Sequence, residues 1–218
     1  MKMKWRSRYY SGAELNPQVR IKSIDNLSLT LATVSWGEHK ALPDVEAEIE
    51  RFIAASQADL ELTTPFERMG GITQEANTLR VAMQLANDQV LRAFNQTEYQ
   101  EAYEMCLIWC KDRVASIAMI GEMQVFTMSQ EQGIVPLLSV HSPKSSYFPQ
   151  ILLGVEANID VKCLSCPLSQ LSEIYLSHGL KSLPRLSLPP PTAPEDSVIT
   201  SAPQTKANNL DFETLYKQ

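Results

Sequence analysis

The sequence predicts a single α+β domain with antiparallel strands. Apolar residues alternate with a period of two before residue 37 and again after residue 104, while the residues between follow the helical period. Strands that come in runs on either side of a helical stretch are typical of antiparallel meanders, because βαβ units would alternate strand and helix. A length of 218 residues fits one domain with a tail.

The N-terminal part predicts strands over residues 4–10 and 18–36. Within the second stretch, apolar residues alternate in 19–24 and in 27–34. Asp25-Asn26 lies between these two runs and is typical of a tight turn, so we expect a β-hairpin.

Two helices are expected next. Asp44 is a candidate cap for a helix that ends near Asp59, and Thr73 for a longer one that ends near Asn95. Each has apolar residues at helical spacing: Val45, Ile49, Phe52 and Ile53 in the first, and Leu79, Met83, Ala86 and Val90 in the second.

The remaining strands are short and separated by turn signals at 111–112, 121–122 and 130–133. They are expected at 105–109, 114–120, 124–128, 159–166 and 174–177. The two helices would cover one face of a sheet, and the other face needs a second sheet or another layer.

Proline divides the chain. Six of the 13 Pro fall between residues 184 and 203, where aliphatic residues are sparse, which predicts an extended flexible linker. We therefore expect a folded domain over 1–183 and a Pro-rich tail over 184–218. Residues 209–217 regain an apolar pattern and form either a frayed terminus or a short docking segment, which would present one apolar face if helical.

Charge and hydropathy exclude several classes of protein. The net charge is −6, and the only basic cluster is Lys2, Lys4, Arg6 and Arg8, so no nucleic-acid partner is expected. No apolar run is long enough to span a membrane, and the N-terminus lacks the features of a secretory signal. These observations predict a cytoplasmic protein.

Motifs for metal or nucleophilic chemistry are weak. The pairs Cys106-x3-Cys110 and Cys163-x2-Cys166 could supply four thiolates to zinc, but the first pair lies in a strand-like run rather than on a knuckle turn. Free thiols are therefore expected, with zinc or disulfides as alternatives. None of the three His has an evident acidic partner, and the chain has no Gly-x-Ser-x-Gly elbow.

Three strings in a fixed order resemble the type 2C metal-dependent serine/threonine phosphatases over about residues 4–183. They are Leu31-Ala-Thr-Val-Ser-Trp-Gly-Glu-His39, Ile117-Ala-Met-Ile-Gly-Glu-Met-Gln-Val-Phe126 and Glu173-Ile-Tyr-Leu-Ser-His-Gly-Leu180. Ala86-Asn87-Asp88 also resembles the helix that precedes the family's central strands. The resemblance implies an antiparallel β-sandwich flanked by helices, in the layer order α-β-β-α.

The resemblance also implies a site that has changed. In the family, aspartates hold two divalent ions, and a metal-bound water attacks the phosphorus. Here Trp36-Gly37 stands for the first Asp-Gly, Glu122 for the Asp after the next turn glycine, and His178-Gly179 for the Asp-Gly of the last strand. An indole cannot ligate a hard cation and imidazole is a poor ligand for magnesium. We therefore expect no catalytic residue, no bound metal and no other cofactor.

These positions favour a catalytically inactive, phosphatase-like regulatory or scaffold module, cytoplasmic and bacterial, that binds a partner protein. One alternative is an atypical metal-dependent phosphoserine/phosphothreonine phosphatase that uses Glu38 and Glu122. A second is a structural subunit of a larger assembly. A third is an unrelated α+β domain in which Trp36, Glu122 and His178 are loop and core residues.

Overall fold

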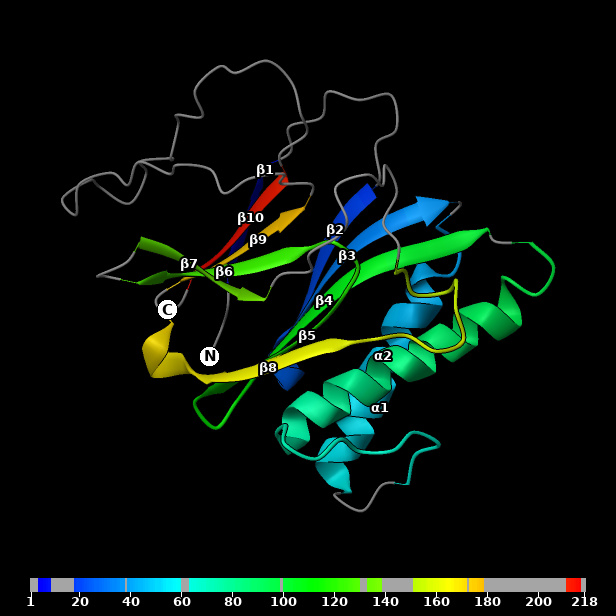
Figure 1. Ribbon diagram of the computed structural model, residues 1–218, viewed down its shortest axis with the longest axis horizontal. Coiled ribbons are helices and arrows are strands. Elements are labelled where there is room, and N and C mark those ends of the chain that lie inside the picture. Colours follow the sequence, from blue (N-terminus) through cyan, green and yellow to red (C-terminus); the bar gives the residue numbers. More distant parts are fainter. Residues whose placement is uncertain are drawn as a thin grey trace.

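Two antiparallel five-stranded sheets stack on one another, and two helices cover the free face of one of them (Figure 1). This computed structural model describes residues 4–8, 18–37, 39–59, 63–98, 100–129, 133–138, 151–171, 173–178 and 211–216. The predicted α+β sandwich is confirmed. Within the described ranges, helices cover only one side of the sandwich, so three of the four expected layers are seen.

We call the two sheets the helix-side sheet and the second sheet. In spatial order, the helix-side sheet consists of β2 (Gln18–Ile24), β3 (Leu29–Gly37), β4 (Glu101–Lys111), β5 (Val114–Ile120) and β8 (Lys162–Pro167). The second sheet consists of β1 (Lys4–Arg8), β10 (Asp211–Tyr216), β9 (Glu173–His178), β6 (Gln124–Ser129) and β7 (Gly133–Leu138). The predicted β2–β3 hairpin is confirmed, and β7 is an additional strand.

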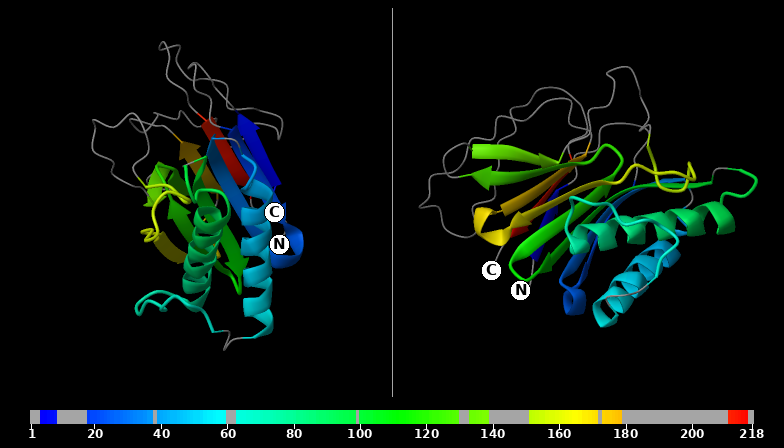
Figure 2. Two further views of the ribbon diagram at one scale, coloured as in Figure 1. Left: turned by 90° about the vertical axis from the view of Figure 1, so that its right-hand side faces the viewer. Right: turned by 60° about the horizontal axis from the view of Figure 1, so that its bottom comes forward.

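The helices α1 (Leu42–Ala58) and α2 (Gln74–Ala93) lie side by side over the helix-side sheet (Figure 2). The predicted cap of α2 is confirmed, because the Ala76 amide donates to Thr73 Oγ1 at 3.1 Å. The predicted cap of α1 is wrong: Ala41 is its N-cap and Asp44 lies in the first turn. Pro43 is tolerated in this turn because first-turn amides have no acceptor within the helix. The Asp44 carboxylate interacts favourably with the positive end of the helix dipole.

The core has two layers, and the central strand β4 contributes to both. Met105, Leu107 and Trp109 belong to the apolar cluster shared with the helices. Cys106 and Ile108 belong to the cluster between the sheets. This double burial explains why β4 reads as a continuous apolar run rather than an alternating one.

The second sheet includes a strand from the end of the chain. Residues 211–216, for which a helical face was considered, form β10 between β1 and β9, with Asp211 opposite His178. The sheet therefore extends past residue 183, where we expected the folded domain to end. The Pro-rich stretch 184–203 lies outside the described residues, and its flexibility stays a prediction.

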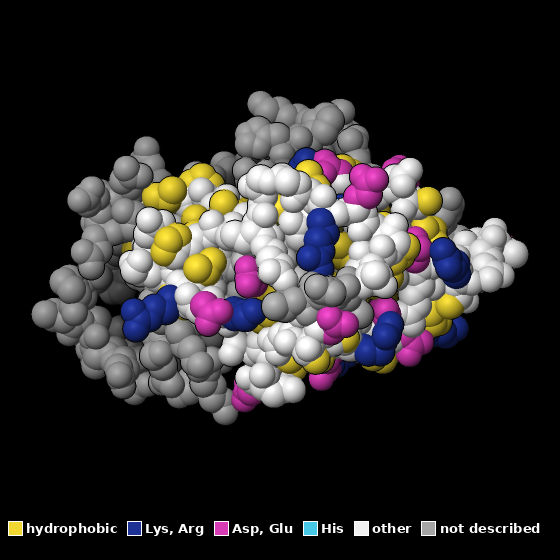
Figure 3. All heavy atoms as spheres, turned by 90° about the horizontal axis from the view of Figure 1, so that it is seen from below, with side chains coloured by type: hydrophobic (Ala, Val, Ile, Leu, Met, Phe, Trp, Pro, Cys, Tyr) yellow, Lys and Arg dark blue, Asp and Glu magenta, His cyan; other side chains and the backbone are white. Residues whose placement is uncertain are grey.

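The outer surface of the helices is polar. Lys and Arg side chains alternate with Asp and Glu over this face (Figure 3), and local pairs such as Arg51–Glu48 at 2.7 Å and Arg92–Asp88 at 3.0 Å contribute to it. In the part of the chain that the structure describes, no helix is long and apolar enough to cross a membrane.

Candidate functional site

The structure brings the predicted site positions to one end of the sandwich. Trp36 and Gly37 end β3, and Glu122 follows β5, which runs parallel to β3 on the far side of β4. Strand β6 then begins with Gln124 opposite Ser177 of β9, so the backbone of His178 lies at this end as well. The side chain of His178, together with Glu38 and Gly179, lies outside the described residues.

A carboxylate that we did not predict occupies the centre of this end. Glu104 of β4 is 0% exposed and is on the strand face that points toward the second sheet, like Cys106 and Ile108. The Trp36 indole donates from Nε1 to Glu104 Oε1 at 3.1 Å, and the Glu122 amide donates to Oε2 at 2.6 Å. Glu104 thereby connects the end of β3 to the turn after β5.

Two glycines allow these elements to approach one another. Gly121 has φ of +97°, and a Cβ there would lie 2.4 Å from Glu104 Cγ and 2.7 Å from its Oε2. Gly37 has φ of +104°, and a Cβ there would lie 2.0 Å from the Gln100 carbonyl oxygen. Both positions require glycine because of the backbone angle and because of the space.

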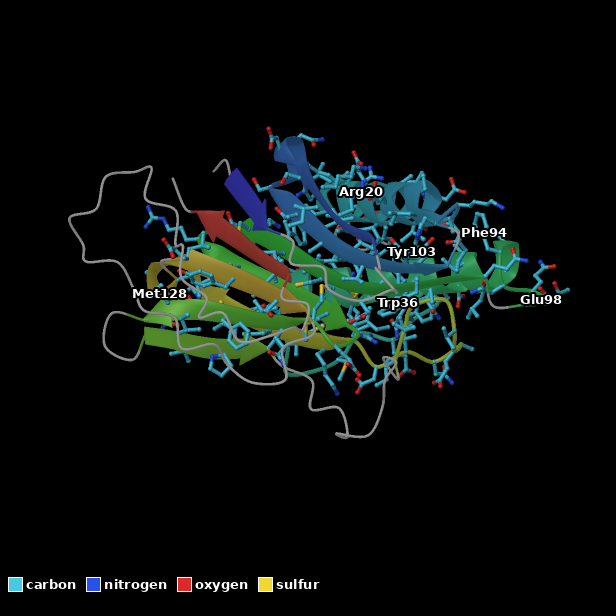
Figure 4. All side chains as sticks on the ribbon, turned by 90° about the horizontal axis from the view of Figure 1, so that it is seen from above. Arg20, Trp36, Phe94, Glu98, Tyr103 and Met128 are labelled. Atoms are coloured by element: carbon cyan, nitrogen blue, oxygen red, sulfur yellow. The ribbon has the colours of Figure 1, made fainter. Side chains whose placement is uncertain are left out.

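A second buried carboxylate lies nearby, at the start of α1. Glu101 accepts from the Lys40 amide at 2.6 Å and from the Tyr103 hydroxyl at 2.5 Å. Burial, and then the bond to Glu101, raise the pKa of Tyr103. Tyr103 and Trp36 lie at the same end of the sheet, where β3 ends and β4 begins (Figure 4). Glu101 and Tyr103 thus hold the segment that leads into α1.

Asn87 of α2 and Asn95, which follows this helix, fix the segment that passes beside β4. Asn87 Oδ1 accepts from the Gly154 amide at 2.7 Å, and Asn95 donates to the Gly154 and Glu101 carbonyls, both at 2.6 Å. The Asn87 of the family-like string is therefore a packing residue in this chain, holding the loop before β8 against the helix.

No family model matches the sequence, and no curated protein matches it. Solved structures do match. The serine/threonine phosphatase Stp1 from Staphylococcus aureus has a TM-score of 0.58 at 12% identity, covering 100% of this chain and 96% of its own. PppA, a key regulatory component of T6SS in Pseudomonas aeruginosa, has a TM-score of 0.59 at 11% identity, covering 99% of this chain and 98% of its own. The PPM Ser-Thr phosphatase MsPP from Mycobacterium smegmatis, in complex with cacodylate, has a TM-score of 0.59 at 10% identity, covering 99% of this chain and 98% of its own. The chain has the fold of the PPM-type serine/threonine phosphatases.

In this PPM-type fold, the residues at the end of the sandwich do not fit a divalent cation. Magnesium and manganese need several oxygen ligands with free lone pairs. Trp36 offers a donor instead, and an N–H group lies against each oxygen of the fully buried Glu104, where a cation would have to approach. Glu122 Oε1 is buried without a hydrogen-bond partner among the described residues, so this carboxylate is a possible ligand, but a single one. Within the described ranges, no group of three or more His, Cys, Asp or Glu could hold a metal ion.

The thiols and the one described histidine side chain do not form a nucleophilic pair. The four Cys are free and lie on β4 and β8, which β5 separates, so they cannot form one zinc site. Burial raises the pKa of Cys106, and it raises the pKa of Cys163 to about 11, so both stay protonated at neutral pH. His39 Nδ1 is buried and has no hydrogen-bond partner among the described residues.

Sequence reasoning located the two turns of this PPM-type site but missed the acids between them. Glu101 and Glu104 are buried acidic residues at the start of an apolar strand, with 2% and 0% exposure. A charge that interrupts a buried run is a signal in itself, because buried acids need partners. The sequence could not say which donors those partners are.

Proposed function

We propose that this chain is a catalytically inactive phosphatase-like protein, a pseudophosphatase, that acts as a regulatory or scaffold module by binding a partner protein. The observation that carries the proposal is the hydrogen bonding of the Glu104 carboxylate. It is the buried carboxylate between the two turns, and N–H donors engage both of its oxygens.

The other positions support the same proposal. A metal-dependent phosphatase must lower the pKa of a metal-bound water and neutralise charge on the transferred phosphoryl group. Trp36 cannot ligate the ions that do this, and Glu122 alone supplies too few oxygens. The fold is compatible with a regulatory role, since PppA is described as a regulatory component.

The test of inactivity is manganese titration by calorimetry together with release of phosphate from p-nitrophenyl phosphate, with Stp1 assayed in parallel as an active control. We expect no two-site manganese binding and no metal-stimulated phosphate release. Metal-stimulated release that Glu122→Ala abolishes would overturn the proposal in favour of an atypical phosphatase.

The test of partner binding is the mass of the native particle. The chain, tagged at its own locus and purified at its own expression level, should elute in a complex larger than its monomer, with one protein species at constant stoichiometry. Elution of the chain alone would contradict a binding role. An assembly from which the chain never separates would indicate a structural subunit instead.

A further inference from the structure

We infer that the end of the sandwich is an anion-binding cradle and that Glu104 is its built-in ligand. The inference rests on geometry and goes beyond the proposed lack of activity. Two N–H donors from different elements, the indole of Trp36 at the end of β3 and the amide of Glu122 after β5, converge on one carboxylate from β4.

The polarity of this arrangement is opposite to that of a metal site. A site for a hard cation gathers oxygen acceptors around an empty centre, whereas here N–H donors surround an acceptor. A carboxylate with no exposed surface is retained in a fold only if donors replace its lost water. The Glu104 side chain on β4 therefore joins the end of β3 to the turn after β5.

The geometry also specifies the shape of the ligand. Trp36 donates to Oε1 and the Glu122 amide donates to Oε2, so each oxygen of the planar carboxylate has its own N–H donor. The absence of a side chain at Gly121 leaves the room that the carboxylate fills, since a Cβ there would overlap it. A small monocarboxylate such as formate or acetate reproduces both contacts, whereas a halide ion accepts at a single centre.

Chemical rescue tests the inference. Glu104→Ala removes the ligand and leaves both donors, so its melting temperature should fall. Sodium formate or acetate should then raise it saturably, while sodium chloride at equal ionic strength should not. Wild type, whose cradle is filled, should show no saturable response to either carboxylate. Adding Trp36→Phe to Glu104→Ala removes one donor and should weaken the carboxylate midpoint about tenfold.

A second measurement keeps the inference testable if Glu104→Ala does not fold. The indole N–H proton of Trp36 is identified by NMR as the signal lost in Trp36→Phe. It should exchange slowly with solvent in wild type and shift in Glu104→Gln, whose amide cannot accept at both atoms. Failure of both carboxylates to stabilise a folded Glu104→Ala overturns the cradle, as does an unshifted indole proton in Glu104→Gln. Either failure is distinguishable from a failure of the proposed function, because manganese binding and phosphate release test that function separately.

Discussion

Replacing Gly121 with alanine is the most direct test of how Glu104 packs. An added Cβ at this position would lie 2.4 Å from Glu104 Cγ, and the backbone there has φ of +97°. Gly71 offers a matched control, because its φ is +85° and nothing lies within 4 Å of an added Cβ. Gly71→Ala therefore carries the backbone strain alone, and Gly121→Ala carries that strain plus the displacement of Glu104.

The expected magnitudes follow from these contacts. An L-residue in left-handed backbone costs about 1–2 kcal/mol, which applies to both variants. Displacing Glu104 breaks at least one hydrogen bond to a charged group, which costs about 1.5–3 kcal/mol more. We expect the free energy of unfolding to fall by about 1–2 kcal/mol for Gly71→Ala and by about 2.5–5 kcal/mol for Gly121→Ala. At this chain length, the extra loss lowers the melting temperature by about 3–12 °C.

Urea unfolding followed by circular dichroism measures both variants, and equal m-values are required for the comparison. Combining Gly121→Ala with Glu104→Ala closes a double-mutant cycle. Glu104→Ala removes the contacts with Cγ and Oε2 but keeps Glu104 Cβ, which would lie 2.6 Å from the added Cβ. In this background the cost of Gly121→Ala should therefore fall but stay above that of the control. Equal costs for Gly121→Ala and Gly71→Ala in the wild-type background would refute the packing of Glu104 against the turn.

Three further predictions concern single residues. Tyr103→Phe removes one donor from the buried Glu101 carboxylate and should cost about 1–3 kcal/mol in urea unfolding; a loss below about 0.5 kcal/mol would contradict the bond. Thr73→Ala removes the α2 cap and should cost about 1 kcal/mol, again by urea; an unchanged midpoint would contradict it. Burial raises the pKa of Cys106 above that of an unfolded thiol, so its contribution to stability is complete below about pH 8.5 and is lost as pH rises. Stability measured across pH 8.5–11 should fall by up to about 1.4 kcal/mol per pH unit from this thiol, and Cys106→Ala should flatten that slope.

Most of the helix-side sheet and its helices could be predicted because their signals are local. Thr73 precedes a clear apolar stripe, and β5 was expected at its observed bounds, Val114–Ile120. The second sheet was harder. Strand β7 contains Pro136, and proline normally argues against a strand, but β7 is an edge strand, where proline is tolerated. Strand β10 is defined by pairing with β1 and β9 from distant parts of the chain, which no local period reveals.

The site shows the same division between local and long-range information. The ordered strings identified the turns at Trp36 and Glu122 from residue types alone. Glu104 was missed because its role depends on contacts with residues 68 positions before it and 18 positions after it. A short-range pattern can mark a buried charge as unusual, but only the fold names its partners.

The chain is not short of acids, since it has 25 Asp and Glu, so the poor fit to a metal has another cause. Glu104 is 0% exposed, and the Trp36 indole and the Glu122 amide each place an N–H donor against one of its oxygens, where a cation would otherwise approach. Adding an acid at position 36 would remove one donor and place a second charge beside Glu104, while the Glu122 amide would still hold the other oxygen. Recovering a metal site therefore requires acids to be added and N–H donors to be removed at the same time. Either change made alone, adding an acid or removing a donor, leaves a buried carboxylate with too few partners, which destabilises the fold. This loss of stability separates the present arrangement from a metal-binding one.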